Sequence, residues 1–512
     1  MRKVCSFAIL WFATILAASS FAGEETAAGK LTISSTKVGN VFFTEEQVSF
    51  MVTAENLPSG GEVKIESVDF DGKVVASATK GRYGGGRAVA DVSFGVQQIG
   101  YYLVRAEVAS EGKIISKAES SYAVIVGPEK RKRAESSPFA MDVAASWFFR
   151  NEKDMKTVCE LLRLAGISCV RDRMAWSGIE PSKGTYRWGW YDRSATIQHD
   201  SGLTIYQITH DCPTWASGKT DRRYPPTNPA DMGNFFRNLV ARFKDRVKYW
   251  EIWNEADIKT FYLGTPEEYA ACLKETYRQI KEADPEAKVL VCSFALAPGE
   301  FAEKIFVAGI ADSFDIYNVH YYGDPQGVVH RLRNHKKFME KHGIRKPIWV
   351  TEMGAFHHKD RGDQQTLRGE ASYLVKAYVY GLANGAERFF YFIFTDFTEE
   401  EKNFGTVNRD FTPRPAYVAL CNLTCLLGEG KFLRKGEETD ENIEYYVFQD
   451  GDREAAVLWV KEGAPRSFRT KGPKVVEAVD VIGREIPFRN FDDGTFEVQV
   501  GPEPVILKGA PR

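Results

Sequence analysis

The feature that most constrains the fold is a central stretch, residues 139–427, in which strand-like and helix-like patterns alternate. Short apolar runs predict eight strands, at Phe139–Ala145, Ser168–Arg171, Leu203–Thr209, Val247–Trp253, Val289–Ser293, Phe314–Val319, Pro347–Glu352 and Phe389–Phe394. Helices are predicted in the gaps, at Asp154–Ala165, Ala230–Phe243, Pro266–Ala283, Phe301–Ala311, Val328–His342, Gln365–Ala383 and Pro415–Leu427, with a less regular pattern at Tyr191–Asp200. Eight such repeats favour a (β/α)8 TIM barrel over an open doubly wound sheet. The sequence has no GxGxxG fingerprint for a dinucleotide.

Both flanks of this stretch have the pattern of β structure. Residues 23–127 contain short alternating runs separated by glycine-rich turns, which predicts an N-terminal β-sandwich. We interpret it as a structural accessory domain in preference to a carbohydrate-binding module, because it has no paired carboxylates or histidine clusters. Residues 128–138 are charged and polar and predict a linker. Residues 428–512 return to short strands and predict a small C-terminal β-sandwich.

The first residues have the pattern of an export signal. Arg2 and Lys3 precede an apolar run, and small residues near Ala22 offer a cleavage site, so residues 1–22 are expected to be a signal peptide. No later apolar segment is long enough to span a membrane. We therefore expect a secreted or periplasmic protein without a membrane span after signal removal. Seven cysteines remain, without CxxC spacing, and are expected to be small buried side chains and not disulfides.

Charge and composition exclude some partners. A formal net charge of −2 over 512 residues gives no indication of nucleic acid binding. Ten Trp and 22 Tyr supply faces that stack on sugar rings, although most should lie in the core. The pair His357-His358 with Asp360 suggests a metal site, but adjacent side chains point apart and no third ligand has helical spacing. No metal and no cofactor are predicted.

Two of the predicted strands end in glutamate. Glu255 closes the run Tyr249–Asn254, and Glu352 closes the run Pro347–Thr351. Because the carboxyl ends of all barrel strands point into one mouth, these two side chains are expected to meet there. Two facing carboxyl groups suit the hydrolysis of a glycosidic bond, with retention at a separation of about 5–5.5 Å and inversion at a wider one.

These two strands resemble the catalytic strands of clan A glycoside hydrolases, which are retaining (β/α)8 enzymes. Residues 247–255 resemble the clan's W-E-x-W-N-E strand, and residues 347–354 resemble P-[IV]-x-x-T-E-x-G. The resemblance implies that Glu255 is the general acid/base, that Glu352 is the nucleophile and that Asn254 binds the sugar 2-hydroxyl. Residues 176–190 are most similar to family 39, with families 5 and 42 as neighbours.

Other positions fit the same resemblance. Arg171 and Trp176 are similar to the strand-two R-x4-W pattern, which implies that Arg171 keeps the nucleophile ionised; Arg173 is an alternative for that role. His210 ends the third strand and begins a loop similar to the clan's Pro-x-Trp loop. Trp176 and His210 are therefore expected to line the substrate cleft.

Strands six and eight add the remaining predicted contacts. His320 and Tyr322 resemble the strand-six residues that lie beside the nucleophile. Two positions depart from the clan: Ala256 replaces the usual Pro after Asn-Glu, and strand eight has Tyr391 among phenylalanines where a Trp platform is usual. Tyr391 or a neighbouring Phe is expected to form the floor under the sugar.

Together these patterns predict an exported retaining glycosidase that acts on β-linked oligo- or polysaccharides by double displacement. The alternative is a non-catalytic glycan-binding protein on the same barrel, and the presence of both glutamates argues against it. A serine or cysteine hydrolase is disfavoured, because no GxSxG motif is present and Cys212 has only His210 nearby for activation. The sugar, its linkage, exo or endo action and the oligomeric state stay open.

Overall fold

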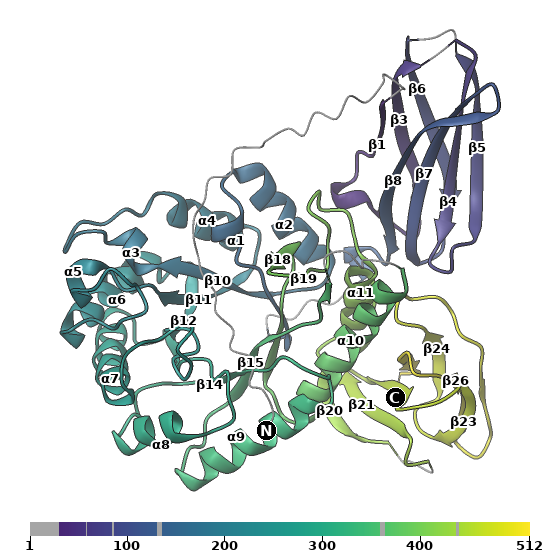
Figure 1. Cartoon of the computed structure of the whole chain (residues 1–512). Helices are drawn as coiled ribbons and strands as arrows, with labels where there is room; N and C mark the ends of the chain where they lie inside the picture. Colours follow the sequence, from purple (N-terminus) through teal and green to yellow (C-terminus); the bar gives the residue numbers. More distant parts are fainter. Residues whose placement is uncertain are drawn as a thin grey trace, which may run out of the picture.

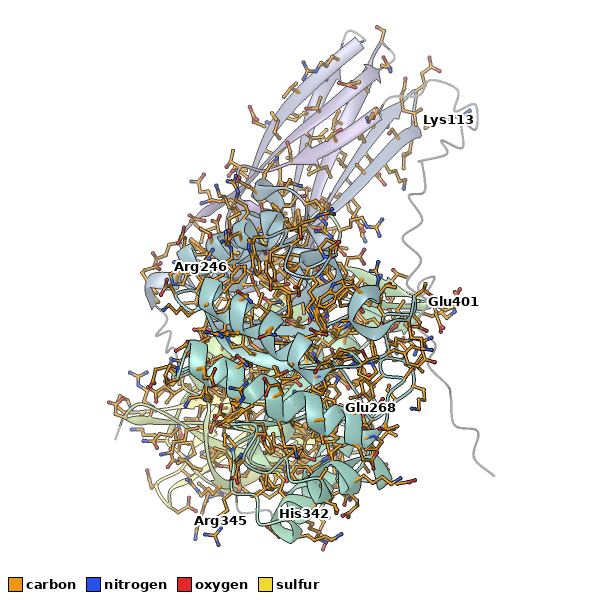
Figure 2. All side chains as sticks on the ribbon, turned by 90° about the vertical axis from the view of Figure 1, so that its left-hand side faces the viewer. Lys113, Arg246, Glu268, His342, Arg345 and Glu401 are labelled. Atoms are coloured by element: carbon orange, nitrogen blue, oxygen red, sulfur yellow. The ribbon has the colours of Figure 1, made fainter. Side chains whose placement is uncertain are left out.

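The computed structural model describes residues 30–57, 59–83, 86–130, 136–358, 364–436 and 440–511. The predicted signal peptide at residues 1–22 and part of the predicted linker lie outside these ranges. An α/β barrel forms the centre of the molecule, with β sheets packed on it at both ends of the chain (Figure 1). Lys113 marks the far tip of the N-terminal β sheets (Figure 2).

Eight parallel strands form the barrel in the order β13-β12-β11-β10-β9-β17-β15-β14. Their bounds are β9 (Phe139–Asp142), β10 (Cys169–Ala175), β11 (Thr204–His210), β12 (Val247–Ile252), β13 (Lys288–Leu290), β14 (Tyr317–His320), β15 (Ile348–Met353) and β17 (Arg388–Tyr391). The two end strands meet through the parallel bridges Leu290–Ile316 and Phe294–Val319, which complete the ring. The predicted TIM barrel is confirmed.

Helices cover the outside of this ring. The longer ones are α2 (Glu152–Leu164), α4 (Gly189–Asp200), α6 (Pro229–Phe243), α7 (Pro266–Ala283), α8 (Glu300–Val307), α9 (Gly327–Lys341), α10 (Gln364–Ala383) and α11 (Pro415–Leu427). The bounds of α7 are those predicted from the sequence. Its start is fixed by a capping box between Thr265 and Glu268 and by Pro266 in the first turn. Three short helices follow strands at the mouth, α1 (Ala145–Phe148), α3 (Trp176–Ile179) and α5 (Thr214–Ser217).

The first barrel strand is shorter than predicted. It ends at Asp142, not at Ala145, because Ala144 adopts a left-handed backbone conformation with φ 42° and turns the chain into α1. A left-handed conformation is costly for a residue with a side chain. Its occurrence beside the mouth indicates that the loop geometry there is fixed by its surroundings.

The lumen of the barrel changes from apolar to charged towards the mouth. A buried apolar cluster fills its lower part, formed by Ala140, Cys169, Tyr206, Leu290, Ile316, Trp349 and Phe390. Side chains two residues apart on a strand share a face. Asp142 and Arg171 therefore stand directly above Ala140 and Cys169, and both are fully buried. This stacking supports the strand tips from below.

Two packed sheets form the N-terminal β-sandwich. One contains β1 (Lys30–Ser34), β3 (Gln47–Leu57) and β6 (Gly86–Val96); the other contains β2 (Val41–Phe43), β8 (Lys113–Ile125), β7 (Gly100–Ser110), β4 (Gly61–Asp69) and β5 (Val74–Tyr83). Phe50 and Tyr122 meet between the sheets, with ring centroids 5.4 Å apart. At the barrel end, Phe70 and Tyr101 join the apolar cluster of the barrel helices, whereas the core between the two sheets is a separate cluster.

The C-terminal β region also has two sheets. The larger contains β20 (Lys431–Lys435), β21 (Ile443–Asp450), β22 (Arg453–Val460), β27 (Val505–Gly509) and β24 (Val475–Val479); the smaller contains β23 (Arg466–Lys471), β26 (Thr495–Val500) and β25 (Phe488–Asn490). Helices α10 and α11 lie between these sheets and the barrel (Figure 1). Tyr446 and Trp459 extend the shared apolar cluster into this region.

One element at the mouth was not predicted. β18 (Phe397–Glu399) and β19 (Lys402–Phe404) form a hairpin after the last barrel strand, and β19 also pairs with β16 (His357–His358). Glu401, at the hairpin turn, points outward (Figure 2).

The cysteines are small buried side chains, as predicted, with one exception. Those from Cys159 to Cys421 are buried, Cys425 is half-buried, and none forms a disulfide within the described residues. No helix within the described ranges is long and apolar enough to cross a membrane.

Candidate active site

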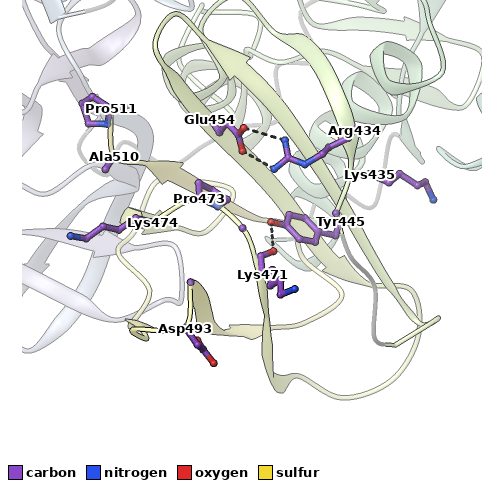
Figure 3. Close-up of a pocket in the computed structure, with 13 residues that line it drawn as sticks. Arg434, Lys435, Tyr445, Glu454, Lys471, Pro473, Lys474, Asp493, Ala510 and Pro511 are labelled. Atoms are coloured by element: carbon purple, nitrogen blue, oxygen red, sulfur yellow. Dashed lines mark hydrogen bonds and ion pairs between the residues drawn. The ribbon is translucent and has the colours of Figure 1, made fainter.

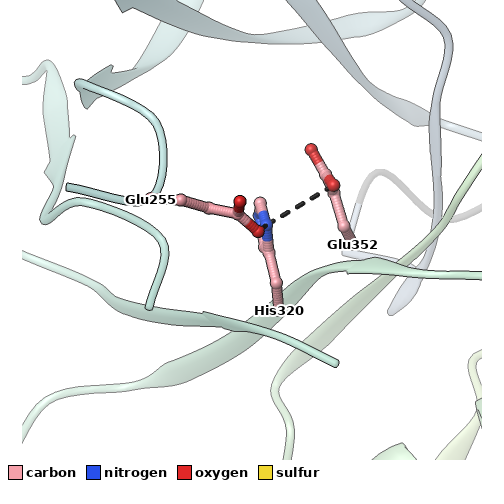
Figure 4. Close-up of side chains that lie close together, drawn as sticks. All are labelled: Glu255, His320 and Glu352. Carbon is pink, nitrogen blue, oxygen red and sulfur yellow. Dashed lines mark hydrogen bonds and ion pairs between the residues drawn. The ribbon is translucent and has the colours of Figure 1, made fainter. Parts of the chain in front are cut away.

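Glu255 and Glu352 face each other at the mouth of the barrel, as predicted (Figure 4). Glu255 follows β12, Glu352 lies in β15, and a carboxyl oxygen of each lies within 4.8 Å of the other and of the His320 ring. His320 Nδ1 is 2.7 Å from Glu255 Oε1 and 3.4 Å from Glu352 Oε2. Both carboxyl groups are largely buried, with Glu255 8% and Glu352 6% exposed.

Three donors hold the Glu352 carboxyl group. The Arg171 guanidinium donates to Glu352 Oε1, and Arg173 Nη2 donates to the same oxygen at 3.2 Å. The Tyr322 hydroxyl donates to Oε2 at 2.7 Å. Both oxygens of Glu352 are thus bonded by charged or hydroxyl donors, which fix the position of the carboxyl group.

Arg171 connects Glu352 to the acidic side chains beneath it. Its Nη1 donates to Asp142 at 2.8 Å, its Nε to Glu251 at 3.0 Å and its Nη2 to Asn254 Oδ1 at 2.9 Å. Burial opposes the charge of this guanidinium, but Glu251 and Glu352 outweigh burial and raise the pKa of Arg171 well above its usual value. Arg171 is therefore a fixed cation.

Glu251 anchors the network from below. It accepts hydrogen bonds from the Tyr206 hydroxyl, from Asn318 Nδ2 at 3.1 Å and from the Ser293 amide at 3.1 Å. A buried carboxylate is costly unless its oxygens are paired, and here both oxygens have donors. The strands β11, β12 and β14 are thus tied to the cation that holds Glu352.

Glu255 has the opposite electrostatic environment. Burial raises the pKa of Glu255 well above its usual value, and the charges of Glu352 and Asp257 raise it further. Its hydrogen-bond partner is neutral, because burial, with the nearby Arg171, lowers the pKa of His320 well below its usual value. The backbone of Glu255 is left-handed with φ 42°, which is strained for a residue with a side chain and directs the carboxyl group towards the cleft.

The structure brings most of the predicted contact residues to this site. Asn254, Arg171, His320 and Tyr322 contact the two glutamates or each other, as described above. His210 lies at the end of β11 with Nδ1 2.9 Å from Asp211 Oδ1 and its ring edge against Trp147 at 5.4 Å. His210 thus stands at the mouth without touching either carboxyl group in the described contacts.

Trp176 and Tyr391 do not face the cleft. Trp176 is 1% exposed, stacks on Phe235 of α6 and donates from Nε1 to Glu180 at 2.9 Å. Tyr391 is 2% exposed, and its ring stacks beside Tyr378 of α10. Neither ring has a free face for a sugar, so the predicted contact of each with substrate has no support in the structure.

Phe392 lies closer to the site than Tyr391. Its ring packs edge-on against Tyr322 at 5.8 Å, and Tyr322 contacts Glu352. The absence of a side chain at Gly354 lets the backbone of Phe392 lie this close to β15, because a Cβ atom at Gly354 would lie 1.6 Å from the Phe392 carbonyl oxygen. The predicted alternative, a phenylalanine floor under the sugar, thus has its nearest candidate in Phe392.

Three buried residues of the network were not predicted from the sequence. Asp142, Glu251 and Tyr206 surround Arg171, and each falls within a predicted strand whose sequence pattern indicates only core. An acidic residue within a buried strand is rare unless it is paired. That rarity, at Asp142 and Glu251, was the available signal.

The trio Glu255, His320 and Glu352 also has the spacing of a metal site. However, Arg171 and Arg173 already bind Glu352, and two guanidinium groups in contact disfavour a divalent cation there. The adjacent histidines His357 and His358 have different surroundings. His357 is buried with Nδ1 2.7 Å from Glu370 Oε1, whereas His358 is exposed. Asp360 lies outside the described residues.

A separate hollow of about 700 Å³ lies in the C-terminal β region (Figure 3). It contains the ion pair between Arg434 and Glu454 at 2.8 Å, and the Tyr445 hydroxyl donates to the Lys471 carbonyl at 3.2 Å. Its two lining carboxylates each pair with an arginine, Glu454 with Arg434 and Asp493 with Arg469 at 2.8 Å. This hollow lacks the acid–base pair of the barrel mouth.

Comparisons with known proteins agree with the barrel fold. Residues 182–412 match the family model described as glycosyl hydrolase catalytic core. A β-xylosidase of Caldicellulosiruptor saccharolyticus is 24% identical over 283 residues, which cover 49% of this chain and 57% of that enzyme. The chain thus spans little more than half the length of this relative.

Solved structures share the fold. A family 39 glycoside hydrolase of the gut symbiont Bacteroides cellulosilyticus WH2 has a TM-score of 0.74 at 22% identity, covering 92% of this chain and 99% of that chain. A family 39 β-xylosidase of Caulobacter crescentus has a TM-score of 0.55 at 15% identity, covering 76% and 98%. The resemblance predicted from the two glutamate strands is confirmed to this extent: residues 182–412 match a glycosyl hydrolase catalytic core, and the barrel shares its fold with family 39 glycoside hydrolases.

Proposed function

We propose that the protein is an exported, retaining glycoside hydrolase that cleaves β-linked oligo- or polysaccharides by double displacement. The observation that carries this proposal is the approach of Glu255 and Glu352 to within 4.8 Å, with two guanidinium groups bonded to Glu352 and a neutral imidazole bonded to Glu255. A separation of about 5 Å suits a nucleophile that reaches the anomeric carbon directly, whereas an inverting pair needs room for a water molecule.

In the first step, Glu352 is the nucleophile. Its carboxylate attacks the anomeric carbon, the bond from that carbon to the leaving oxygen breaks, and Glu255 gives its proton to that oxygen. Arg171, Arg173 and the Tyr322 hydroxyl keep Glu352 ionised and aimed at the sugar. The products are a glycosyl ester on Glu352 and the free alcohol.

In the second step, Glu255 acts as a base, because Glu352 no longer carries a negative charge. Esterified Glu352 is neutral, so its contribution to the raised pKa of Glu255 is lost. Glu255, now a carboxylate, takes a proton from water, and the water oxygen attacks the anomeric carbon. Glu352 leaves as a carboxylate, Glu255 is protonated again, and the sugar is released with its original configuration.

Asn254 is proposed to bind the sugar 2-hydroxyl. Its Oδ1 accepts from Arg171 at 2.9 Å and from the Ser293 hydroxyl at 3.4 Å. Because Oδ1 is held on that side, the amide NH2 group is directed away from Arg171 and is available as a donor. Hydrogen bonds to the 2-hydroxyl strengthen in the transition state of this reaction.

The substrate class follows the relatives. Two of the similar proteins are described as β-xylosidases, so a β-xyloside is the first substrate to test. Residues 1–22 are proposed to direct export, which would bring the enzyme to extracellular or periplasmic polysaccharide.

A panel of 4-nitrophenyl α- and β-glycosides, followed by plant and bacterial polysaccharides, tests the proposal. We expect hydrolysis of one β-glycoside, with the β-anomer as the first product detected by NMR. Release of the α-anomer first would contradict retention. If the protein binds a glycan but hydrolyses no member of the panel, the non-catalytic alternative holds instead.

A further inference from the structure

The segment after Glu255 carries a second carboxylate that the mechanism does not use. Asp257 is partly buried two residues beyond Glu255. Its Oδ1 accepts from the Ala295 amide at 3.1 Å and its Oδ2 from the Leu296 amide at 2.9 Å. The two oxygens of Asp257 thus bind consecutive amides of the loop that follows β13. These hydrogen bonds join the loop that carries Glu255 to the loop after β13.

The loop held by Asp257 is fixed from its other side as well. His335 of α9 has Nε2 3.1 Å from the Leu296 carbonyl, and its Nδ1 is 2.8 Å from the Tyr317 hydroxyl. Burial lowers the pKa of His335 to about 3, so this ring is neutral at ordinary pH. Asp257 is therefore held in a rigid position relative to Glu255.

A cation stands behind the same loop. Arg331 of α9 lies over the Tyr321 ring at 5.6 Å, and its Nη1 is buried without a hydrogen-bond acceptor in the described part of the chain. Burial lowers the pKa of Arg331, whereas the charges of Asp257 and Glu255 raise it. A poorly solvated guanidinium acts over a longer range than an exposed one, because water screens it less.

We propose that Asp257 and Arg331 are a pair of positioning residues of opposite charge that together set the pH range in which Glu255 keeps its proton. The inference rests on the proposed role of Glu255 as the general acid. Asp257 keeps the proton on Glu255, and Arg331 favours its release. Neither residue needs to touch the substrate.

The sign of each effect follows from charge. Ionised Asp257 repels a second negative charge, so it contributes to the raised pKa of Glu255. Burial raises the pKa of Asp257 itself to about 6, so Asp257 becomes ionised as the pH rises through that value. The effect of the Asp257 charge on Glu255 therefore increases at pH values at which an ordinary glutamate, with a pKa of about 4.3, would already have lost its proton.

Other charged and titratable groups also act on this pair from the surrounding elements. Those acting on Glu255 are Arg171, Glu251, His320, Tyr322 and Glu352. Those acting on Asp257 or affected by it are Cys292, Tyr317 and Arg331. All of them stay in place when Asp257 or Arg331 is changed, so the two substitutions isolate the pair.

The test compares Asp257→Asn and Arg331→Gln in the full chain. The protonation of Glu255 is followed directly by infrared difference spectroscopy, as the carboxylic acid band that Glu255→Gln removes. We expect Asp257→Asn to move its titration down by about 0.5–1 pH unit and Arg331→Gln to move it up by about 0.5 unit. The alkaline limb of kcat/KM on an unactivated phenyl β-glycoside should move in the same two directions.

Matched controls separate charge from local damage. Asp324→Asn removes another carboxylate that accepts a backbone amide at the mouth, from Gln326 at 2.9 Å, and Arg333→Gln removes an exposed cation from the same helix as Arg331. Both controls should leave the titration of Glu255 unchanged.

Shifts in the same direction for both test variants, or no shift in either, would overturn the proposal. If Asp257→Asn proves unfolded, Arg331→Gln decides alone, and the absence of an upward shift overturns it. If the wild-type protein hydrolyses no glycoside, the proposed function fails, but the infrared titration still tests the pair.

Discussion

Glu352 and Glu255 share one mouth, but their surroundings differ in charge and in hydrogen bonding. Glu352 accepts from two guanidinium groups and a hydroxyl, whereas Glu255 faces a neutral imidazole and two carboxylates. The same kind of side chain is thus bonded by cations on one side of the mouth and buried beside carboxylates on the other. The difference arises from the strands beneath, because Arg171 is placed by Asp142 and Glu251 and not by the loops.

The largest effect should come from Glu352→Gln. The amide cannot form the ester, so we expect loss of turnover by on the order of 10⁵-fold or more on every substrate. The comparison also predicts that Glu255 titrates at lower pH in this variant, because its strongest charged neighbour is gone. Steady-state kinetics and an infrared titration measure the two effects, and near-normal turnover would contradict the assignment of the nucleophile.

Glu255→Gln should have a smaller effect that depends on the leaving group. General acid catalysis contributes about 10²–10⁴-fold, and an activated aryl leaving group needs little of it. We expect severe loss on a phenyl glycoside and a much smaller loss in the first step on a 2,4-dinitrophenyl glycoside. Added azide should restore turnover, since it attacks the ester without a base. Equal losses on both substrates would argue against the acid role.

Tyr322→Phe tests one hydrogen bond to the anion. A hydrogen bond to a charged group contributes about 1.5–3 kcal/mol, so removal of this hydroxyl should lower kcat by about tenfold to a hundredfold. Tyr391→Phe is the matched control, because its hydroxyl accepts from the Ala355 amide away from the cleft. If both variants lose the same activity, the contact with Glu352 is not the cause.

The smallest effect concerns stability. A carboxyl group with a raised pKa in the folded state favours folding at low pH, and this contribution is lost as pH rises from about 4.3 through the raised value. Gln at position 255 has no proton to lose. Glu255→Gln should therefore melt on the order of 1–2 °C above the wild type near neutral pH, and the difference should vanish below pH 4. Calorimetry at several pH values measures it, and a difference independent of pH would exclude this cause.

How far the sequence predicts this site depends on whether a residue ends a strand. Glu255 and Glu352 were predictable because each interrupts an apolar run at its carboxyl end. The facing of Tyr391 was not, because strand alternation leaves the phase open. Trp176 begins the short helix α3, whose direction turns its ring to Phe235 of α6. In β17, Phe390 fills the lumen and Tyr391 therefore points outward to α10, which places Phe392 on the inner side.

The hairpin of β18 and β19 was missed for a different reason. Its turn contains Glu400 with φ 53°, a conformation that Gly or Asn usually signals. Three consecutive glutamates gave no such signal. The buried partners of Arg171 were hidden for a third reason, since only the folded barrel brings Asp142 and Glu251 to one side chain.

The apolar cluster that runs from Phe70 through the barrel to Trp459 has a consequence for how this protein can be shortened. Removing either flanking β region to obtain a barrel fragment would expose apolar surface on α10 and α11, and the shortened chain should aggregate.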